Sequence, residues 1–237
     1  MHETNKIYQH GTLATLIEGL YEGTLSVGEL LKHGDYGIGT VGDLDGEMIA
    51  MDGKAFQITS EGQVNQLTDN VLVPFATVHF HQPDVSIQFE NVAGSILEEQ
   101  LLELYPYQNL FFGIVIKGTF SKMSTRSVAK QSKPYPTLTA VTAEQSEFSA
   151  EHINGTIVGY FTPKLFQGIG AAGFHLHFLS DKMDMGGHIL DYHLENGMVS
   201  LQPFSSLEQH FPIGNDAFLK SNVNVAKLHD EIKLAEN

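Results

Sequence analysis

The sequence predicts a mixed α/β fold of the α+β kind, with two β-sheet-based halves and flanking helices. Short apolar segments separated by Asp-Gly and Asn-Gly steps run through most of the chain, and this pattern is typical of antiparallel hairpins. Helical spacing is confined to a few stretches. A loop with two prolines lies at residues 130–136. We therefore expect an N-terminal α/β domain with a mixed sheet over 1–140 and a C-terminal domain over 141–237.

Helices are expected where apolar residues follow helical spacing, at residues 12–20, 26–31 and 95–104. In the last of these, Ser95 followed by Glu98 predicts a capping box at the start of the helix. Strands are expected where β-branched and aromatic residues gather, at residues 71–81, 110–119 and 153–161. Two Asp-Gly steps, Asp45-Gly46 and Asp52-Gly53, are each flanked by apolar residues and predict the turns of β-hairpins.

In the C-terminal half, residues 173–192 predict a hairpin that carries three histidines. Asn196-Gly197 then turns the chain into a further strand at 198–204. A short helix at 206–210 and a terminal helix at 224–235 are expected to close the chain.

The composition limits the classes of partner. The chain has 237 residues, 42% of them hydrophobic and 17% charged, which is typical of a folded globular protein. The net charge of −15 argues against nucleic acid and anionic membranes as partners. Zero Cys excludes disulfides and thiolate metal sites. We see no signal peptide and no membrane-spanning stretch, so we expect a soluble cytoplasmic protein.

The histidine hairpin is the strongest chemical signal. His175 and His177 alternate with apolar residues, so on a strand both imidazoles point the same way, roughly 6.5–7 Å apart at the backbone. A turn after Ser180 would bring His188 alongside them. Three neutral nitrogen ligands with one position left open are what a catalytic zinc needs. The pattern therefore favours a metal-dependent enzyme.

His-x-His on a strand also occurs in cupins, and this chain has a second such pair. A cupin places an acid and a glycine beyond the pair, as Asp181 and Gly187 nearly do, but its third ligand lies much further along the chain. The second pair, His79 and His81, has no third histidine nearby and is expected at a partly exposed strand end.

Two charged residues outside the hairpin also stand out. Arg126 is the single arginine among 13 basic residues. Its planar guanidinium can bind a carboxylate through two parallel hydrogen bonds. Glu47 begins a strand directly after an Asp-Gly turn, where its side chain can face a cleft.

The chain resembles the bacterial α-acetolactate decarboxylase family over nearly its full length. The blocks that carry the resemblance occur in the family's order: LDGEMIAMDGKAFQ, GTFSKMSTRSV, GFHLHFLSDKMDMGGHILDY, FPIGNDAF and the terminal Ala-Glu. The resemblance implies decarboxylation of (S)-2-acetolactate to (R)-acetoin and CO2 in acetoin and butanediol biosynthesis. It also implies a Zn2+ cofactor, a two-domain α/β fold and a homodimer.

The resemblance also assigns roles to residues. It implies that His175, His177 and His188 bind zinc and that Arg126 and Glu47 are active-site residues. It implies that a C-terminal glutamate folds back to the metal; Glu236 matches it and Glu231 is the alternative. Thr40 and Val128 are implied to line the substrate pocket. A cupin-like metal-dependent oxygenase and a non-catalytic small-molecule binding protein stay open as alternatives.

Overall fold

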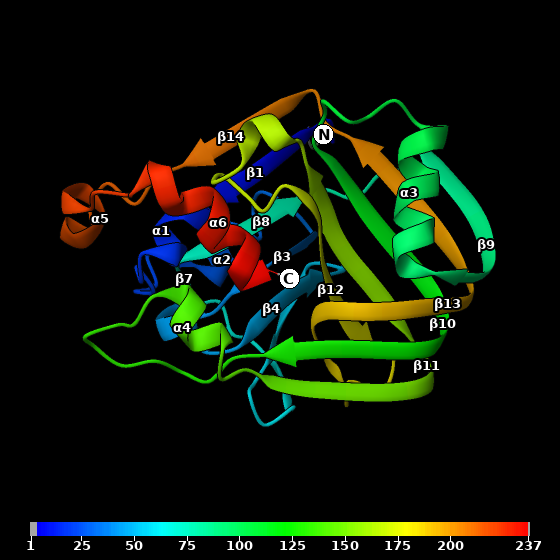
Figure 1. The fold of residues 1–237 in the computed structure, drawn as a ribbon, viewed down its shortest axis with the longest axis horizontal. Helices are drawn as coiled ribbons and strands as arrows, with labels where there is room; N and C mark the ends of the chain where they lie inside the picture. The colour runs from blue at the N-terminus through cyan, green and yellow to red at the C-terminus, as the bar shows by residue number, and fades with distance from the viewer. Residues whose placement is uncertain (1–3, 237) are drawn as a thin grey trace.

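Two β-sheets with small helices around them form the protein (Figure 1). The computed structural model describes residues 4–236 and, within that range, every side chain except those of residues 229 and 236. The predicted fold class, mixed α/β with two sheets and flanking helices, is confirmed.

The first sheet has the strand order β14-β1-β8-β3-β4-β5-β6. Its strands are β1 (Lys6–His10), β3 (Tyr36–Thr40), β4 (Glu47–Met51), β5 (Lys54–Ile58), β6 (Val64–Gln66), β8 (Phe75–His79) and β14 (Ser206–His210). The short helix expected at 206–210 is wrong. These residues form β14, because parallel pairing with β1 satisfies their backbone groups at the edge of the sheet.

The second sheet is built from long, strongly bent strands, β9 (Val85–Ala93), β10 (Phe112–Ser127), β11 (Ser146–Thr162), β12 (Gly173–Ser180) and β13 (Gly186–Pro203). The strand order is β10-β11-β12-β13-β9, and β10 also pairs with β13. Four of the strands therefore close into a ring. A third, two-stranded sheet joins β2 (Leu25–Ser26) to β7 (Leu72–Val73).

The helices are α1 (Leu13–Ile17), α2 (Val27–Leu30), α3 (Gly94–Leu104), α4 (Leu138–Thr142), α5 (Asp216–Lys220) and α6 (Val225–Glu236), with 3-10 turns η1 (Gly42–Leu44) and η2 (Lys164–Phe166). Helix α6 packs on α1 and α4, so the C-terminal end returns to the middle of the molecule (Figure 1). No helix in the described range has the length and apolar character to cross a membrane.

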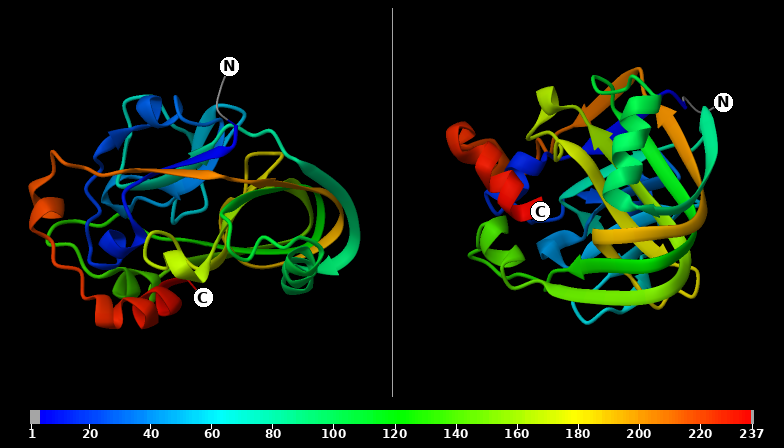
Figure 2. Two further views of the ribbon diagram at one scale, coloured as in Figure 1. Left: turned by 90° about the horizontal axis from the view of Figure 1, so that it is seen from above. Right: turned by 45° about the vertical axis from the view of Figure 1, so that its right-hand side comes forward.

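Helix α3 packs its buried Leu97 and Leu101 against one face of the second sheet (Figure 2). The expected capping box of Ser95 and Glu98 is wrong, because the N-cap is Ala93 and it makes no side-chain capping bond. The chain passes directly from β9 into the helix, so Ser95 already lies inside the first turn.

The two sheets share a core in which side chains of β3, β4 and β5 meet those of β10, β11 and β12. The second sheet combines strands from both sides of residue 140, and β14 from the far end of the chain joins the first sheet. The division into domains 1–140 and 141–237 stays a prediction.

Candidate active site

Three histidines from neighbouring strands converge in the second sheet. His177 on β12 lies opposite His188 on β13, and His175 precedes on the same face of β12. Their ring centroids are 4.9 to 5.6 Å apart. One ligand atom from each lies within 4.8 Å of the others. The hairpin predicted from the sequence thus forms, and its three histidines make a group that could hold a metal ion.

The environment of His177 sets its tautomer. Its Nδ1 lies 2.9 Å from the Met48 carbonyl oxygen, which can only accept, so Nδ1 carries the proton. Nε2 is therefore unprotonated, and it is buried without a hydrogen-bond partner among the described residues. A buried lone pair left in this way suits a metal ligand whose other nitrogen is fixed by a hydrogen bond.

Both histidines of β12 are held neutral. Burial, followed by the nearby Arg126 charge, lowers the pKa of His175 to about 3. Burial also lowers the pKa of His177 well below its ordinary value, with His175 adding to the effect. Neutral imidazole is the form that binds a metal, so burial favours the metal-binding form of these two histidines.

Glu47 faces the histidines from the first sheet. Its Oε2 lies 3.4 Å from His177 Nε2. The residue follows the Asp45-Gly46 turn directly, and the Thr40 hydroxyl donates to the Gly46 carbonyl oxygen at 2.7 Å. Gly46 has φ +79°, and a Cβ there would lie 2.1 Å from the Ile58 carbonyl oxygen. Glycine is required at this turn, which presents Glu47 to the site.

Arg126 lies on β10 directly opposite His188. It is only 5% exposed. Its Nη1 donates to Gln145 Oε1 at 2.8 Å and its Nη2 donates to the Ala235 carbonyl oxygen at 2.6 Å. The last turn of α6 thus holds the guanidinium from one side. Neither partner could be predicted from a sequence pattern, because a backbone carbonyl has no residue signature and Gln145 lies in the short link between α4 and β11.

One pocket collects these groups. Its polar side is made by Glu47, Arg126 and the three histidines. Its apolar side includes Val128, and Thr40 also lines it. That this pocket holds the substrate stays a prediction. Residues that the sequence had not singled out complete the wall: Leu13, Leu16, Gly39, Leu44, Phe75, Leu138 and Thr142. Amphipathic spacing in α1 was the only available hint for the first two.

Two C-terminal glutamates, Glu236 and Glu231, are candidates for the acid expected near the metal. Glu236 is the last residue of α6, and its side chain lies outside what the structure describes. Glu231 lies one turn earlier, is partly exposed and is not among the described residues that line the pocket. The choice between them stays a prediction.

The second His-x-His pair lies at a strand end, as expected, because His79 is the last residue of β8 and the partly exposed His81 follows it. The expected exposure is wrong for His79, which is 0% exposed. Its Nδ1 lies 2.8 Å from the Tyr160 hydroxyl and its Nε2 lies 3.3 Å from His81 Nδ1. His79 is buried because β8 lies inside the first sheet and Tyr160 of β11 contacts it. This pair joins the two sheets.

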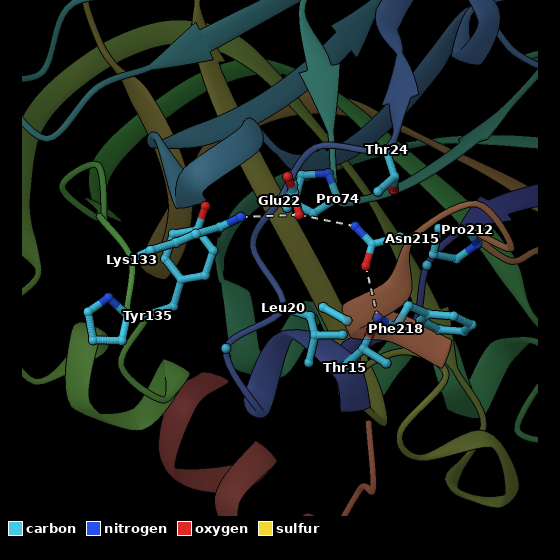
Figure 3. A pocket seen from close by; sticks show the side chains of 14 residues that line it. Thr15, Leu20, Glu22, Thr24, Pro74, Lys133, Tyr135, Pro212, Asn215 and Phe218 are labelled. Atoms are coloured by element: carbon cyan, nitrogen blue, oxygen red, sulfur yellow. Dashed lines mark hydrogen bonds and ion pairs between the residues drawn. The ribbon is translucent and has the colours of Figure 1, made fainter. Parts of the chain in front are cut away.

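A second cavity, of about 210 Å3, is lined by Thr15 of α1 and by Leu20 and Glu22 after it (Figure 3). The Glu22 carboxylate is engaged there by Lys133 at 3.3 Å and by the Asn215 amide at 3.2 Å. Although this cavity is well formed, it contains no group of His, Cys, Asp and Glu among the described residues that could hold a metal. The group that could hold a metal ion lies in the histidine pocket instead.

The family model for alpha-acetolactate decarboxylase matches residues 7–225. Alpha-acetolactate decarboxylase of Lactococcus lactis subsp. cremoris is 41% identical over 237 residues, which cover 100% of both chains. The protein of the same name from Streptococcus thermophilus is 41% identical over 240 residues, again covering 100% of both.

The crystal structure of alpha-acetolactate decarboxylase from Bacillus subtilis strain 168 has the same fold, with a TM-score of 0.95 and 33% identity. The alignment covers 98% of this chain and 99% of that one. The cupin-like and non-catalytic interpretations are therefore wrong, and the resemblance found in the sequence is confirmed. The chain belongs to the alpha-acetolactate decarboxylase family of enzymes.

Proposed function

We propose that the protein catalyses the zinc-dependent decarboxylation of (S)-2-acetolactate to (R)-acetoin and CO2. The observation that carries the proposal is the pocket in which three histidines, Glu47 and the buried Arg126 meet. The family supports acetolactate as the substrate. The same resemblance supports a homodimer and a place in acetoin and butanediol formation.

The residues fit zinc. His175, His177 and His188 would hold it, because one ligand atom from each lies close to the others and the Nε2 of His177 is buried with its lone pair unused among the described residues. Three protein ligands leave a position for substrate, which is the usual arrangement of a catalytic site. When bound, zinc supplies Lewis-acid stabilisation of negative charge on the substrate oxygens.

Arg126 would orient the substrate carboxylate. The guanidinium stays protonated at ordinary pH, so its role is charge and geometry and not proton transfer. Its bonds to Gln145 and to the Ala235 carbonyl fix the plane of the fork before substrate arrives. A carboxylate held in one plane sets the C–C bond that breaks at a defined angle to the neighbouring ketone.

The reaction consumes one proton after CO2 leaves. The electron pair of the broken bond moves toward the ketone oxygen, and the carbon that lost CO2 must then be protonated. Glu47 lies beside His177 and is a candidate to deliver that proton to one face, with Glu236 as the second candidate. The apolar wall that includes Val128, together with Thr40, would keep the bound intermediate from flipping in the pocket. The proton would then reach only one face, so one enantiomer of acetoin forms.

The test is CO2 release and acetoin formation from racemic 2-acetolactate, before and after chelator treatment, with the acetoin resolved by chiral chromatography. We expect (R)-acetoin in excess, loss of activity with chelator and recovery with zinc. Equal amounts of the two acetoin enantiomers would contradict protonation of the intermediate on one face. Activity that survives complete removal of metal would contradict the role of the histidines.

A further inference from the structure

A further cavity lies between helix α3 and the second sheet and shares only His188 with the residues that line the histidine pocket. It has a volume of about 230 Å3, and α3 contributes Gly94, Ser95 and Glu98 to it. The facing strands contribute Phe174 and Leu176 from β12 and residues 188–192 from β13. This is smaller than the pockets that hold drug-sized ligands, so it fits only a short molecule.

Glu98 is the distinctive group of this cavity. The structure describes neither a hydrogen bond nor an ion pair for its carboxyl group. The capping box expected from the sequence would have given it a backbone partner, but that capping box does not form. The other acid in the lining, Asp191, already pairs with Lys122 at 2.6 Å. None of the described residues that line the cavity is Lys or Arg. Burial raises the pKa of Glu98 to about 7, as expected for a carboxylate that lacks a cation.

Tyr192 gives a second, independent indication. It is 3% exposed and lines the cavity, and its hydroxyl has no hydrogen-bond partner among the described residues. Buried hydroxyls are nearly always bonded, so this one calls for a partner. The ring packs closely against the backbone of Gly94, where an added Cβ would lie only 2.5 Å from Tyr192 Cε1.

The cavity has an entrance. Ser95, Glu98 and Phe174 also line a wider groove that runs along α3 past Leu102 and Leu165. Leu165, which lines this groove, is 86% exposed, so the groove opens to solvent. A small molecule can therefore reach Glu98 from solvent along the helix, without passing through the histidine pocket.

We propose that this cavity is a binding site for a small organic cation, a short primary ammonium compound. The ammonium group would pair with Glu98 and donate to the Tyr192 hydroxyl oxygen. The face of Phe174 would add a cation–π contact, and Leu176 and Ile189 would take the alkyl chain. The net charge of −15 raises the local concentration of such cations. His188 lines both this cavity and the histidine pocket, so an occupant would lie next to the proposed metal site.

The experiment titrates butylammonium chloride into the purified zinc-loaded protein, with binding followed by ligand-observed NMR. 1-Butanol serves as the uncharged analogue. We expect saturable binding of butylammonium and much weaker binding of 1-butanol. Glu98→Gln should weaken binding by about tenfold or more, and Tyr192→Phe by about two- to tenfold, from the usual worth of charged and neutral hydrogen bonds. Binding is read without turnover, so the result does not depend on the proposed function.

Glu103→Gln is the matched control, because Glu103 is an exposed acid on the same helix and lines neither space. It should leave the affinity unchanged. The melting temperature of each variant reports whether it folds, and Tyr192→Phe keeps the ring if Glu98→Gln proves unstable. Three results would overturn the proposal: no saturable binding, equal binding of 1-butanol, or a Glu98→Gln protein that binds butylammonium as well as wild type.

Discussion

The two Asp-Gly turns offer a matched pair of substitutions that tests how Glu47 is positioned. Gly46 and Gly53 have nearly the same backbone conformation, with φ +79° and +72°. At Gly46 an added Cβ would lie 2.1 Å from the Ile58 carbonyl oxygen, whereas at Gly53 nothing lies within 4 Å. Alanine therefore meets the same conformational cost at both turns, but only Gly46→Ala meets a clash.

The structure sets the expected magnitudes. The left-handed conformation costs alanine about 1–2 kcal/mol in each variant. To bring the contact at Gly46 to 3.0 Å, the turn must move by about 0.9 Å, which also disturbs the bond from Thr40 to the Gly46 carbonyl. That bond is worth about 0.5–1.5 kcal/mol. Glu47 is the next residue, and a displacement of about 1 Å in a reacting group can lower the rate about 100-fold.

The assay is kcat/KM for acetoin formation together with the melting temperature. We expect Gly53→Ala to keep wild-type kcat/KM and to lose about 2–8 °C in Tm. Gly46→Ala should lose more in Tm and at least about tenfold in kcat/KM, with zinc content unchanged because the three histidines are intact. Equal kcat/KM in the two variants would refute the idea that this turn positions a group the reaction needs.

Three further predictions concern other parts of the site and fold. Arg126→Lys keeps the charge but loses the planar fork and at least one charge-assisted bond, so kcat/KM should fall about 10- to 100-fold; activity equal to wild type would show that the two-point grip is not used. Removing residues 236 and 237 should lower turnover at least about tenfold if Glu236 acts in the reaction; unchanged turnover would move the role to Glu231 or take the tail out of the mechanism. Burial lowers the pKa of His79 to about 3. Below about pH 6.5 this residue is therefore protonated in the unfolded chain but stays neutral in the folded protein. Stability should therefore fall by about 2 kcal/mol between pH 7 and pH 5 from this residue alone, and His79→Gln should reduce the slope of Tm against pH over that range.

The sequence predicted the parts of the site whose chemistry is local. His175 and His177 share a face because a strand alternates, and the Gly-Gly step places His188 within one hairpin of them. The Asp-Gly turn before Glu47 was visible for the same reason. These features depend on residues a few positions apart, where strand and turn geometry leave few alternatives.

What the sequence could not predict depends on contacts between distant positions. The Met48 carbonyl that sets the tautomer of His177 lies 129 positions away in the chain, and the Ala235 carbonyl that holds Arg126 lies 109 positions away. Residues 206–210 became a strand because β1, about 200 positions earlier, offers an edge to pair with. His79 is buried for a similar reason, since β11 covers it.

The geometry also explains why the histidine hairpin by itself cannot order the side chains of the pocket. The hairpin carries three imidazoles, but the proton on His177 Nδ1 is fixed by a carbonyl of β4, which belongs to the other sheet. Glu47 comes from the same strand, and Arg126 is held in place by the last turn of α6. A hairpin without β4 would leave His177 free to exchange tautomers, and a chain without the end of α6 would leave the guanidinium free to rotate. The order of the pocket is therefore a property of how the two sheets and the C-terminal helix pack together, and loosening any one of them should cost activity before it unfolds the protein.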